Sequence, residues 1–113
     1  MMNINKKEQE LIDEVFEHFD FDEVHKVMKL MNWKWMISYD SYEIPSLERI
    51  KSSAKARIEG AIECAKNSKR KTKDIEFFSS SGGIKASAWK NTYGQITNIQ
   101  LQFILTEWQA GED

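Results

Sequence analysis

Few residues of this chain have the side chains and spacing that enzymes use for chemistry. His18 and His25 are the only histidines, and Cys64 is the only cysteine. The two histidines are seven residues apart, a spacing that would align them on one continuous helix. With Asp22 nearby, these three side chains could then form a metal site. Residues 20–22 are expected to interrupt that helix, however. We therefore expect two partly exposed surface histidines and a cysteine that packs against the protein.

No catalytic signature is present elsewhere in the sequence. The chain lacks H-E-x-x-H, G-x-S-x-G and a Ser-His-Asp order, and its N-terminal carboxylates repeat along an acidic helix face without forming a catalytic pair. The run Ser79–Gly83 could cradle a phosphate, but no Walker pattern is present and no helix follows it, so a hairpin turn is the simpler interpretation. We expect no enzyme activity, no metal and no cofactor.

The strongest electrostatic motif is a basic segment at residues 66–73. Five positive charges within eight residues could bind the phosphates of a nucleic acid. The candidate nucleic-acid-binding residues are Lys66, Lys69, Arg70, Lys71 and Lys73. A solvated helix end, favoured by the helix dipole, is the simpler explanation. The net charge of −2 also argues against nucleic-acid binding as the main task.

Charge is distributed unevenly along the chain. Residues 47–73 hold nine basic and three acidic side chains, whereas the first 23 residues hold eight acids and only two lysines. The acidic face of the first helix could occupy a basic, nucleic-acid-binding surface on another protein. Its candidate contact residues are Glu10, Glu14 and Glu17. The alternative is that the acidic and basic elements lie near each other and partly neutralise.

Tryptophans supply a second group of candidate contact residues. Trp33 and Trp35 could form a recognition platform. They alternate with polar residues, so we expect them to fill the core together with Ile37 and Tyr39. Trp89 instead shares a strand face with polar residues and is the best single candidate for an exposed contact. The protein-binding surface predicted around it comprises Trp89, Lys85, Gln100 and Gln102.

Three helices are expected to position these residues. They cover residues 5–19, about 21–31 and 46 to about 66, with N-caps at Asn5, Asp20 and Ser46. The third helix has the clearest apolar stripe in the chain, formed by Leu47, Ile50, Ala54, Ile58, Ala61, Ile62 and Ala65. Its alanines suit a helix that lies closely on a sheet. A close contact would also explain Gly60, which costs about 1 kcal/mol in a helix.

Four strands are expected from runs in which apolar and polar residues alternate. They cover residues 33–39, 75–79, 84–90 and 95 to about 107, and residues 40–45 form a loop before the third helix. Residues 91–94 make a tight turn in which Gly94 supplies a positive φ. The alternation implies one dry and one wet face, which favours antiparallel pairing. Trp108 is expected to pack the C-terminal tail onto the fold.

The order of these elements predicts the fold class. We expect one domain over residues 1–113 of the α+β class, with the order α-α-β-α-β-β-β and helices packed on one face of an antiparallel sheet. The 41% hydrophobic content can supply a core, and a single cysteine excludes an internal disulfide. No apolar run approaches the roughly 20 residues of a membrane span, and the charged N-terminus has no secretory-signal pattern.

Four short stretches of the sequence form a recognisable set. They are residues 21–28 (FDEVHKVM) running into 32–35 (NWKW), residues 44–48 (IPSLE), residues 81–84 (SGGI) and residues 103–108 (FILTEW). Over roughly residues 20–108, the chain resembles small uncharacterised bacteriophage and prophage proteins of the α+β type. The resemblance implies a phage or prophage product in the bacterial cytoplasm. It carries over no catalytic residues, because no activity is assigned to that group.

These observations together predict a binding function. We expect a non-enzymatic, phage-type protein-binding module that binds a host or phage protein and inhibits or redirects a host protein, for example a defence protein. Small phage proteins of this kind often act in that way. A nucleic-acid-binding accessory protein that uses residues 66–73 is the alternative function. A homodimer would equally account for exposed aromatic residues, and no membrane partner is expected.

Overall fold

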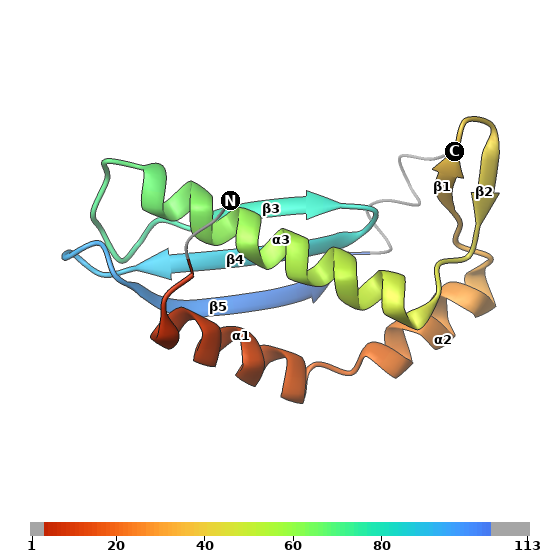
Figure 1. Cartoon of the computed structure of the whole chain (residues 1–113), viewed down its shortest axis with the longest axis horizontal. Helices are drawn as coiled ribbons and strands as arrows, with labels where there is room; N and C mark the ends of the chain where they lie inside the picture. The colour runs from red at the N-terminus through yellow and green to blue at the C-terminus, as the bar shows by residue number, and fades with distance from the viewer. Residues whose placement is uncertain (1–3, 105–113) are drawn as a thin grey trace.

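The structure is a computed structural model that describes residues 4–104 (Figure 1). Its elements follow the order α-α-β-β-α-β-β-β. They are α1 (Lys6–His18), α2 (Phe21–Met31), β1 (Trp35–Ser38), β2 (Ser41–Glu43), α3 (Leu47–Asn67), β3 (Phe77–Ser81), β4 (Ile84–Lys90) and β5 (Ile96–Phe103).

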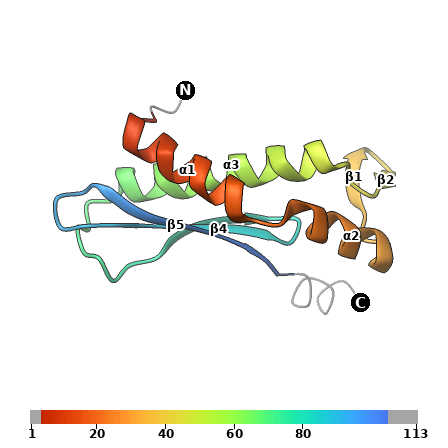
Figure 2. The same ribbon diagram turned by 90° about the horizontal axis from the view of Figure 1, so that it is seen from below.

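Two layers make up the body of the molecule. The antiparallel sheet has the order β3-β4-β5, α3 crosses it, and α1 packs along β5 on the same side (Figure 2). The predicted α+β class, with helices on one face of an antiparallel sheet, is confirmed. No helix among residues 4–104 covers the opposite face of this sheet.

Local sequence signals determine where the helices begin. The Asn5 side chain accepts from the backbone N–H of Glu8, whose own side chain accepts from the Asn5 N–H, so the predicted capping box is present. Asp20 caps α2 and Ser46 caps α3 through the same kind of side-chain bond. The helices therefore start at the positions that the sequence predicts.

Helix α3 lies very close to the sheet. Its stripe is buried as predicted, apart from a half-buried Leu47. A Cβ atom added at Gly60 would lie only 3.1 Å from Ser79 Oγ on β3. This close approach accounts for the glycine, because a Cβ atom there would require Ser79 to give way by a few tenths of an ångström.

The register of the main sheet follows the predicted alternation. Ala86 pairs with Leu101 and Ala88 with Ile99, and all four side chains are buried on the helix-covered face. The strand predicted at residues 75–79 is shifted to Phe77–Ser81, because the three serines continue the ladder with β4. Only Gly82 and Gly83 form the turn, and both have positive φ (61° and 88°), as in a type I′ hairpin. Strand β5 ends at Phe103, and the predicted extension to residue 107 and the role of Trp108 lie outside the described residues.

The segment after α2 differs most from the prediction. Residues 41–43 were expected in a loop but form β2, which pairs with β1 in a separate two-stranded sheet. The expectation that Ile37 and Tyr39 fill the core is wrong, because the hairpin leaves the main sheet and exposes both side chains. Trp33 is buried as expected, and Trp35 is half-buried at the base of the hairpin.

A buried lysine joins the end of α3 to the sheet. Lys90 follows Ala88 on the core face of β4 and is only 1% exposed. Its Nζ donates to the backbone oxygens of Ala65 and Ser68, the latter at 2.8 Å, and lies 5.2 Å from the centre of the Phe77 ring. The ammonium group therefore adds donors at the C-terminal end of the helix, where carbonyls lack intrahelical partners. The Ala65 oxygen also accepts from the backbone N–H of Ser68 at 3.3 Å.

We predict that Lys90→Met lowers the free energy of unfolding by about 1.5–3 kcal/mol, because it removes charge-assisted hydrogen bonds while keeping most of the buried stem. Urea denaturation followed by circular dichroism measures this loss. Lys26→Met, on the exposed face of α2, is the matched control and should change stability by less than about 0.5 kcal/mol. A Lys90→Met variant as stable as the wild type would contradict the assigned role.

Candidate binding site

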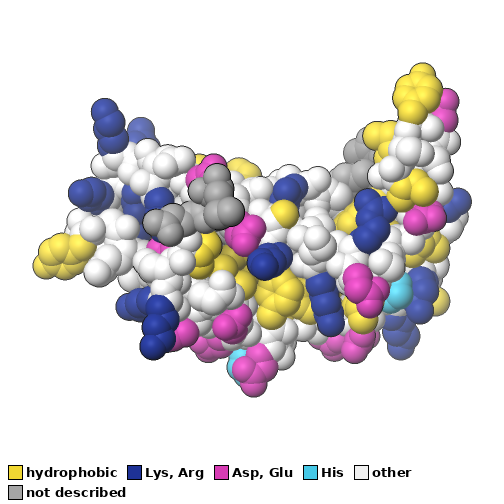
Figure 3. All heavy atoms as spheres, viewed as in Figure 1, with side chains coloured by type: hydrophobic (Ala, Val, Ile, Leu, Met, Phe, Trp, Pro, Cys, Tyr) yellow, Lys and Arg dark blue, Asp and Glu magenta, His cyan; other side chains and the backbone are white. Residues whose placement is uncertain are grey.

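The β1–β2 hairpin projects from the body of the molecule, and we call residues 35–43 the arm (Figure 1). Four large apolar side chains of the arm are 45–91% exposed: Met36, Ile37, Tyr39 and Tyr42. Figure 3 shows hydrophobic side chains at the tip of this projection. Clustered exposed side chains of these types are typical of surfaces that contact other proteins.

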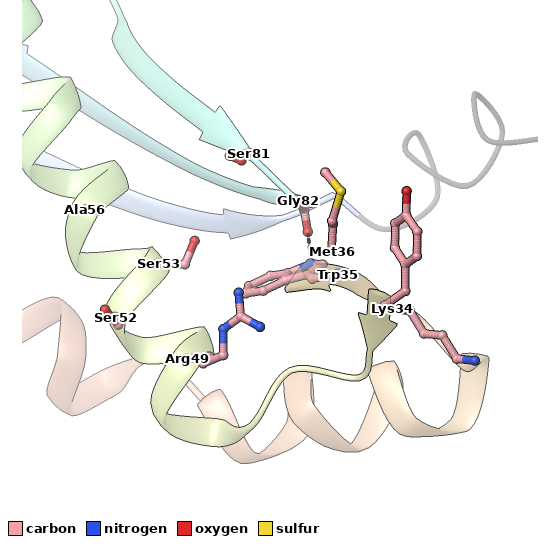
Figure 4. Close-up of a pocket in the computed structure, with 10 residues that line it drawn as sticks. Lys34, Trp35, Met36, Arg49, Ser52, Ser53, Ala56, Ser81 and Gly82 are labelled. Atoms are coloured by element: carbon pink, nitrogen blue, oxygen red, sulfur yellow. Dashed lines mark hydrogen bonds between the residues drawn. The ribbon is translucent and has the colours of Figure 1, made fainter. Parts of the chain in front are cut away.

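Two tryptophans attach the arm to the glycine turn between β3 and β4. Trp35 Nε1 donates to the Gly82 oxygen at 3.1 Å, as the dashed line in Figure 4 shows. The Trp33 ring lies against Gly83 and is 6.0 Å from the ring of Phe103. Cβ atoms added at Gly82 and Gly83 would each lie 2.9 Å from an indole atom. The indoles can approach the turn this closely because neither residue has a side chain.

We predict that Gly82→Ala lowers the free energy of unfolding more than Gly94→Ala does, by at least about 1 kcal/mol. Both glycines have positive φ, so both variants carry the backbone strain. At Gly94 the nearest atom to the added Cβ, Lys71 Cε, is 3.7 Å away, whereas at Gly82 the added Cβ meets Trp35. Urea titrations of the two variants give the difference, and equal losses would contradict the anchoring role of this contact.

A groove of about 620 Å³ lies between the arm, α3 and the glycine turn (Figure 4). It is lined by Lys34, Trp35, Met36, Tyr42, Arg49, Ser52, Ser53, Ala56, Ser81 and Gly82. Small side chains of α3 leave the groove open, and the Arg49 guanidinium lies 5.7 Å from the centre of the Trp35 ring. The charged side chains among the described lining residues, Lys34 and Arg49, are both basic.

The chemistry of this lining favours binding. The described lining residues, all within residues 4–104, include three serines and no histidine or carboxylate. Two aromatic rings, two cations and several hydroxyl groups can hold an apolar or acidic group of a partner. The arm and this groove form the candidate binding site.

The sequence did not identify Met36, Tyr39 and Tyr42 as contact residues. The signal that could have located them is the Asp40 position, where an aspartate with φ of 62° turns the chain between two short alternating runs. A hairpin there would have separated these residues from the core sheet. The arm was missed because the run from Trp33 to Tyr39 has the same alternation as a core strand.

Trp89, Lys85, Gln100 and Gln102 do share one face, as predicted. Lys85 pairs with Gln102 across the ladder, and Trp89 pairs with Asn98. This is the face that no described helix covers, and both glutamines are exposed on it, whereas Trp89 and Lys85 are half-buried. Glu10, Glu14 and Glu17 are exposed on α1, on the other side of the sheet. The structure therefore divides the predicted protein-binding residues between two separate surfaces.

Lys85 is already engaged in a small network on the uncovered face. Its Nζ lies 3.5 Å from Glu76 Oε2 and 4.8 Å from the centre of the Phe78 ring. The hydroxyl of Ser87 donates to the same carboxylate oxygen. The Ser87 hydrogen bond and, after it, the Lys85 charge hold the pKa of Glu76 below its ordinary value of 4.5, against a desolvation effect that raises it.

We predict that Ser87→Ala raises the pKa of Glu76 toward 4.5, because the largest cause of the lowered value is lost. In the wild type, the network stabilises the ionised carboxylate. Its contribution to stability is therefore present above pH 4.5 and is lost as the pH falls through the lowered pKa. Titration of the side-chain carboxyl resonance by NMR measures the pKa in both proteins. Lys85→Met should give a smaller rise, and an unchanged pKa in Ser87→Ala would contradict the network.

The remaining candidate residues do not form a site. Helix α1 ends at His18 before α2 begins, and the two histidines are exposed and half-buried, as expected. Cys64 is exposed, so the expectation that it packs is wrong: it lies outside the buried stripe of α3. Within residues 4–104, no three His, Cys, Asp or Glu side chains form a group that could hold a metal ion.

The basic segment is exposed, and one of its five candidate residues, Lys66, is held in an ion pair. Lys66 Nζ pairs with Glu8 of α1 at 3.0 Å, so one basic and one acidic element do neutralise each other at this point. The other predicted nucleic-acid-binding residues, Lys69, Arg70, Lys71 and Lys73, are exposed after the end of α3.

Comparison of the chain with protein-family models, curated proteins and solved structures finds no match in any of the three. The resemblance to phage proteins therefore stays a prediction. In the part of the chain that the structure describes, no helix has the length and apolar character needed to cross a bilayer.

Proposed function

We propose that this protein is a non-enzymatic protein-binding module and that the arm and its groove form the contact surface. The observation that carries the proposal is the exposure of four large apolar side chains on one projecting hairpin. Tyrosine and methionine are enriched where proteins contact each other. Leaving these side chains in water is unfavourable, and a partner that buries them would recover that free energy.

The anchoring of the arm supports this proposal. An isolated two-stranded hairpin is only marginally stable, but Trp33 and Trp35 attach this one to the sheet. A contact surface that is already ordered loses less conformational entropy when it binds. The arm therefore combines exposed apolar area with a fixed geometry, and this combination favours specific association.

The groove indicates which partner chemistry would fit. Arg49 and Lys34 supply the charge of its lining, so an acidic side chain beside an apolar one would match the groove and the arm together. The uncovered sheet face around Trp89 is a weaker candidate, because Lys85 is held by Glu76 and Trp89 is half-buried. The resemblance to phage proteins favours a host protein as the partner, with a defence protein as one target to test.

We predict that Tyr39→Ser/Tyr42→Ser lowers retention of a bound partner at least tenfold in affinity capture from bacterial lysate, because it removes the largest exposed rings of the arm. Both side chains are exposed, so the thermal midpoint should change little. Tyr93→Ser is the matched control, since Tyr93 is also largely exposed but lies on the β4–β5 turn, away from the arm.

The same experiment separates the competing surfaces. Loss of the partner with Trp89→Ala, but not with the arm variant, would move the contact to the uncovered sheet face and contradict the proposal. Light scattering of the purified protein tests whether the partner is a second copy. A dimer mass that becomes monomeric in the arm variant would identify self-association through the same surface.

A further inference from the structure

Basic side chains from two segments far apart in the sequence gather at the end of the molecule opposite the arm. Figure 3 shows Lys and Arg side chains around the end where α3 finishes and the β4–β5 turn lies. We call this group the basic end, and its members are Lys6, Lys7, Lys69, Arg70, Lys71 and Lys73. None of these residues lines the groove beside the arm.

The β4–β5 turn brings the two segments together. A cleft of about 400 Å³ is lined by Lys6, Lys7 and Glu8 at the start of α1, by Lys66 near the end of α3, and by residues 94–96 at the β4–β5 turn. Lys71 lies against Gly94, with its Cε 3.7 Å from where a Cβ of this glycine would be. Gly94 therefore borders both the cleft and the basic loop that follows α3.

The charges of the basic end have no carboxylate partner among residues 4–104. The ion pairs found there join Lys66 to Glu8 and Lys85 to Glu76, and neither includes a member of the basic end. All six members are exposed, and Asp74 is the acidic residue of the loop itself. Six cations in one region repel each other, and a flexible polyanion would relieve this repulsion.

An exposed aromatic ring lies on the β4–β5 turn, one residue before the Gly94 against which Lys71 lies. Tyr93 is 83% exposed on the β4–β5 turn, next to Gly94. The Asn91 side chain fixes the turn, because its Oδ1 accepts from the backbone N–H groups of Tyr93 and Gln95 at 2.9 and 3.0 Å. The backbone that carries the ring is therefore ordered while the ring itself is free to stack. Cations around an exposed ring are the features with which proteins hold unpaired nucleotides.

We propose that the basic end binds single-stranded nucleic acid, with phosphates on its lysines and arginine and a base stacked on Tyr93. A single strand fits better than a duplex, because a base must be unpaired to stack on the ring. The cations also lie on a loop and a helix start, not along one helix face that could enter a groove. The proposed interface therefore differs from the one that the sequence predicts at residues 66–73. It excludes Lys66, which pairs with Glu8, and it includes Lys6, Lys7 and Tyr93.

Fluorescence anisotropy with a labelled oligothymidylate of about 12 nucleotides tests this proposal. We expect binding that weakens steeply with salt, by roughly 0.7 in the log–log slope for each phosphate contacted. Lys69→Glu/Arg70→Glu/Lys71→Glu should lower the affinity at least tenfold and flatten this slope. Lys6→Glu/Lys7→Glu should act in the same direction from a different segment, so the test does not depend on one variant folding. Tyr93→Ser should weaken binding roughly tenfold and leave the slope unchanged.

Lys26→Glu/Lys29→Glu, on exposed positions of α2, is the matched charge-reversal control and should bind like the wild type. The arm variant Tyr39→Ser/Tyr42→Ser should also bind like the wild type, so failure of this proposal and failure of the arm proposal are distinguishable. Absence of binding at low salt would overturn the proposal. Equal affinity for a duplex of the same length, with no effect of Tyr93→Ser, would overturn the single-strand assignment.

Discussion

Helix α3 can lie directly on the sheet because small side chains meet where the two surfaces touch. Ala54, Ala61 and Ala65 are fully buried on the helix, and Ala86 and Ala88 are fully buried on β4. Dispersion attraction falls steeply with separation, so such close packing strengthens every contact between the layers. The contact also fixes both ends of α3: its first turns form one wall of the groove beside the arm, and its last turn meets Lys90.

Small residues also allow close packing at the base of the arm. Two glycines without side chains allow two large indoles to lie against the turn between β3 and β4. The arm is thereby held by rings that are themselves supported by the body of the protein. The exposed apolar residues of the arm therefore lie on an ordered surface. For this reason we interpret them as a contact site.

Features set by neighbouring residues could be predicted from the sequence, and features set by distant contacts could not. The caps at Asn5, Asp20 and Ser46, the α3 stripe and the bounds of β4 depend on short-range patterns, and they are confirmed. Alternation alone could not show that β1 leaves the main sheet, because a strand in a projecting hairpin has the same period as one in a core. Alternation along β4 does place Lys90 on the core face, but its burial depends on the carbonyls at the end of α3. The only local signal for the exposed arm was the turn at Asp40, which did not show whether the hairpin would join the main sheet. The shared face of Trp89, Gln100 and Gln102, by contrast, followed from strand pairing.

Helix α3 also sets the distance between the two ends of the molecule. Its 21 residues span about 30 Å, with the groove beside its first turns and the basic loop after its last. Two ligands held at these ends would be tethered without touching each other. Because both ligands would be held in one complex, each would have a raised effective concentration near the other, as with any bivalent linker of fixed length. A rigid rod of this kind sets both the spacing and the orientation of what it joins.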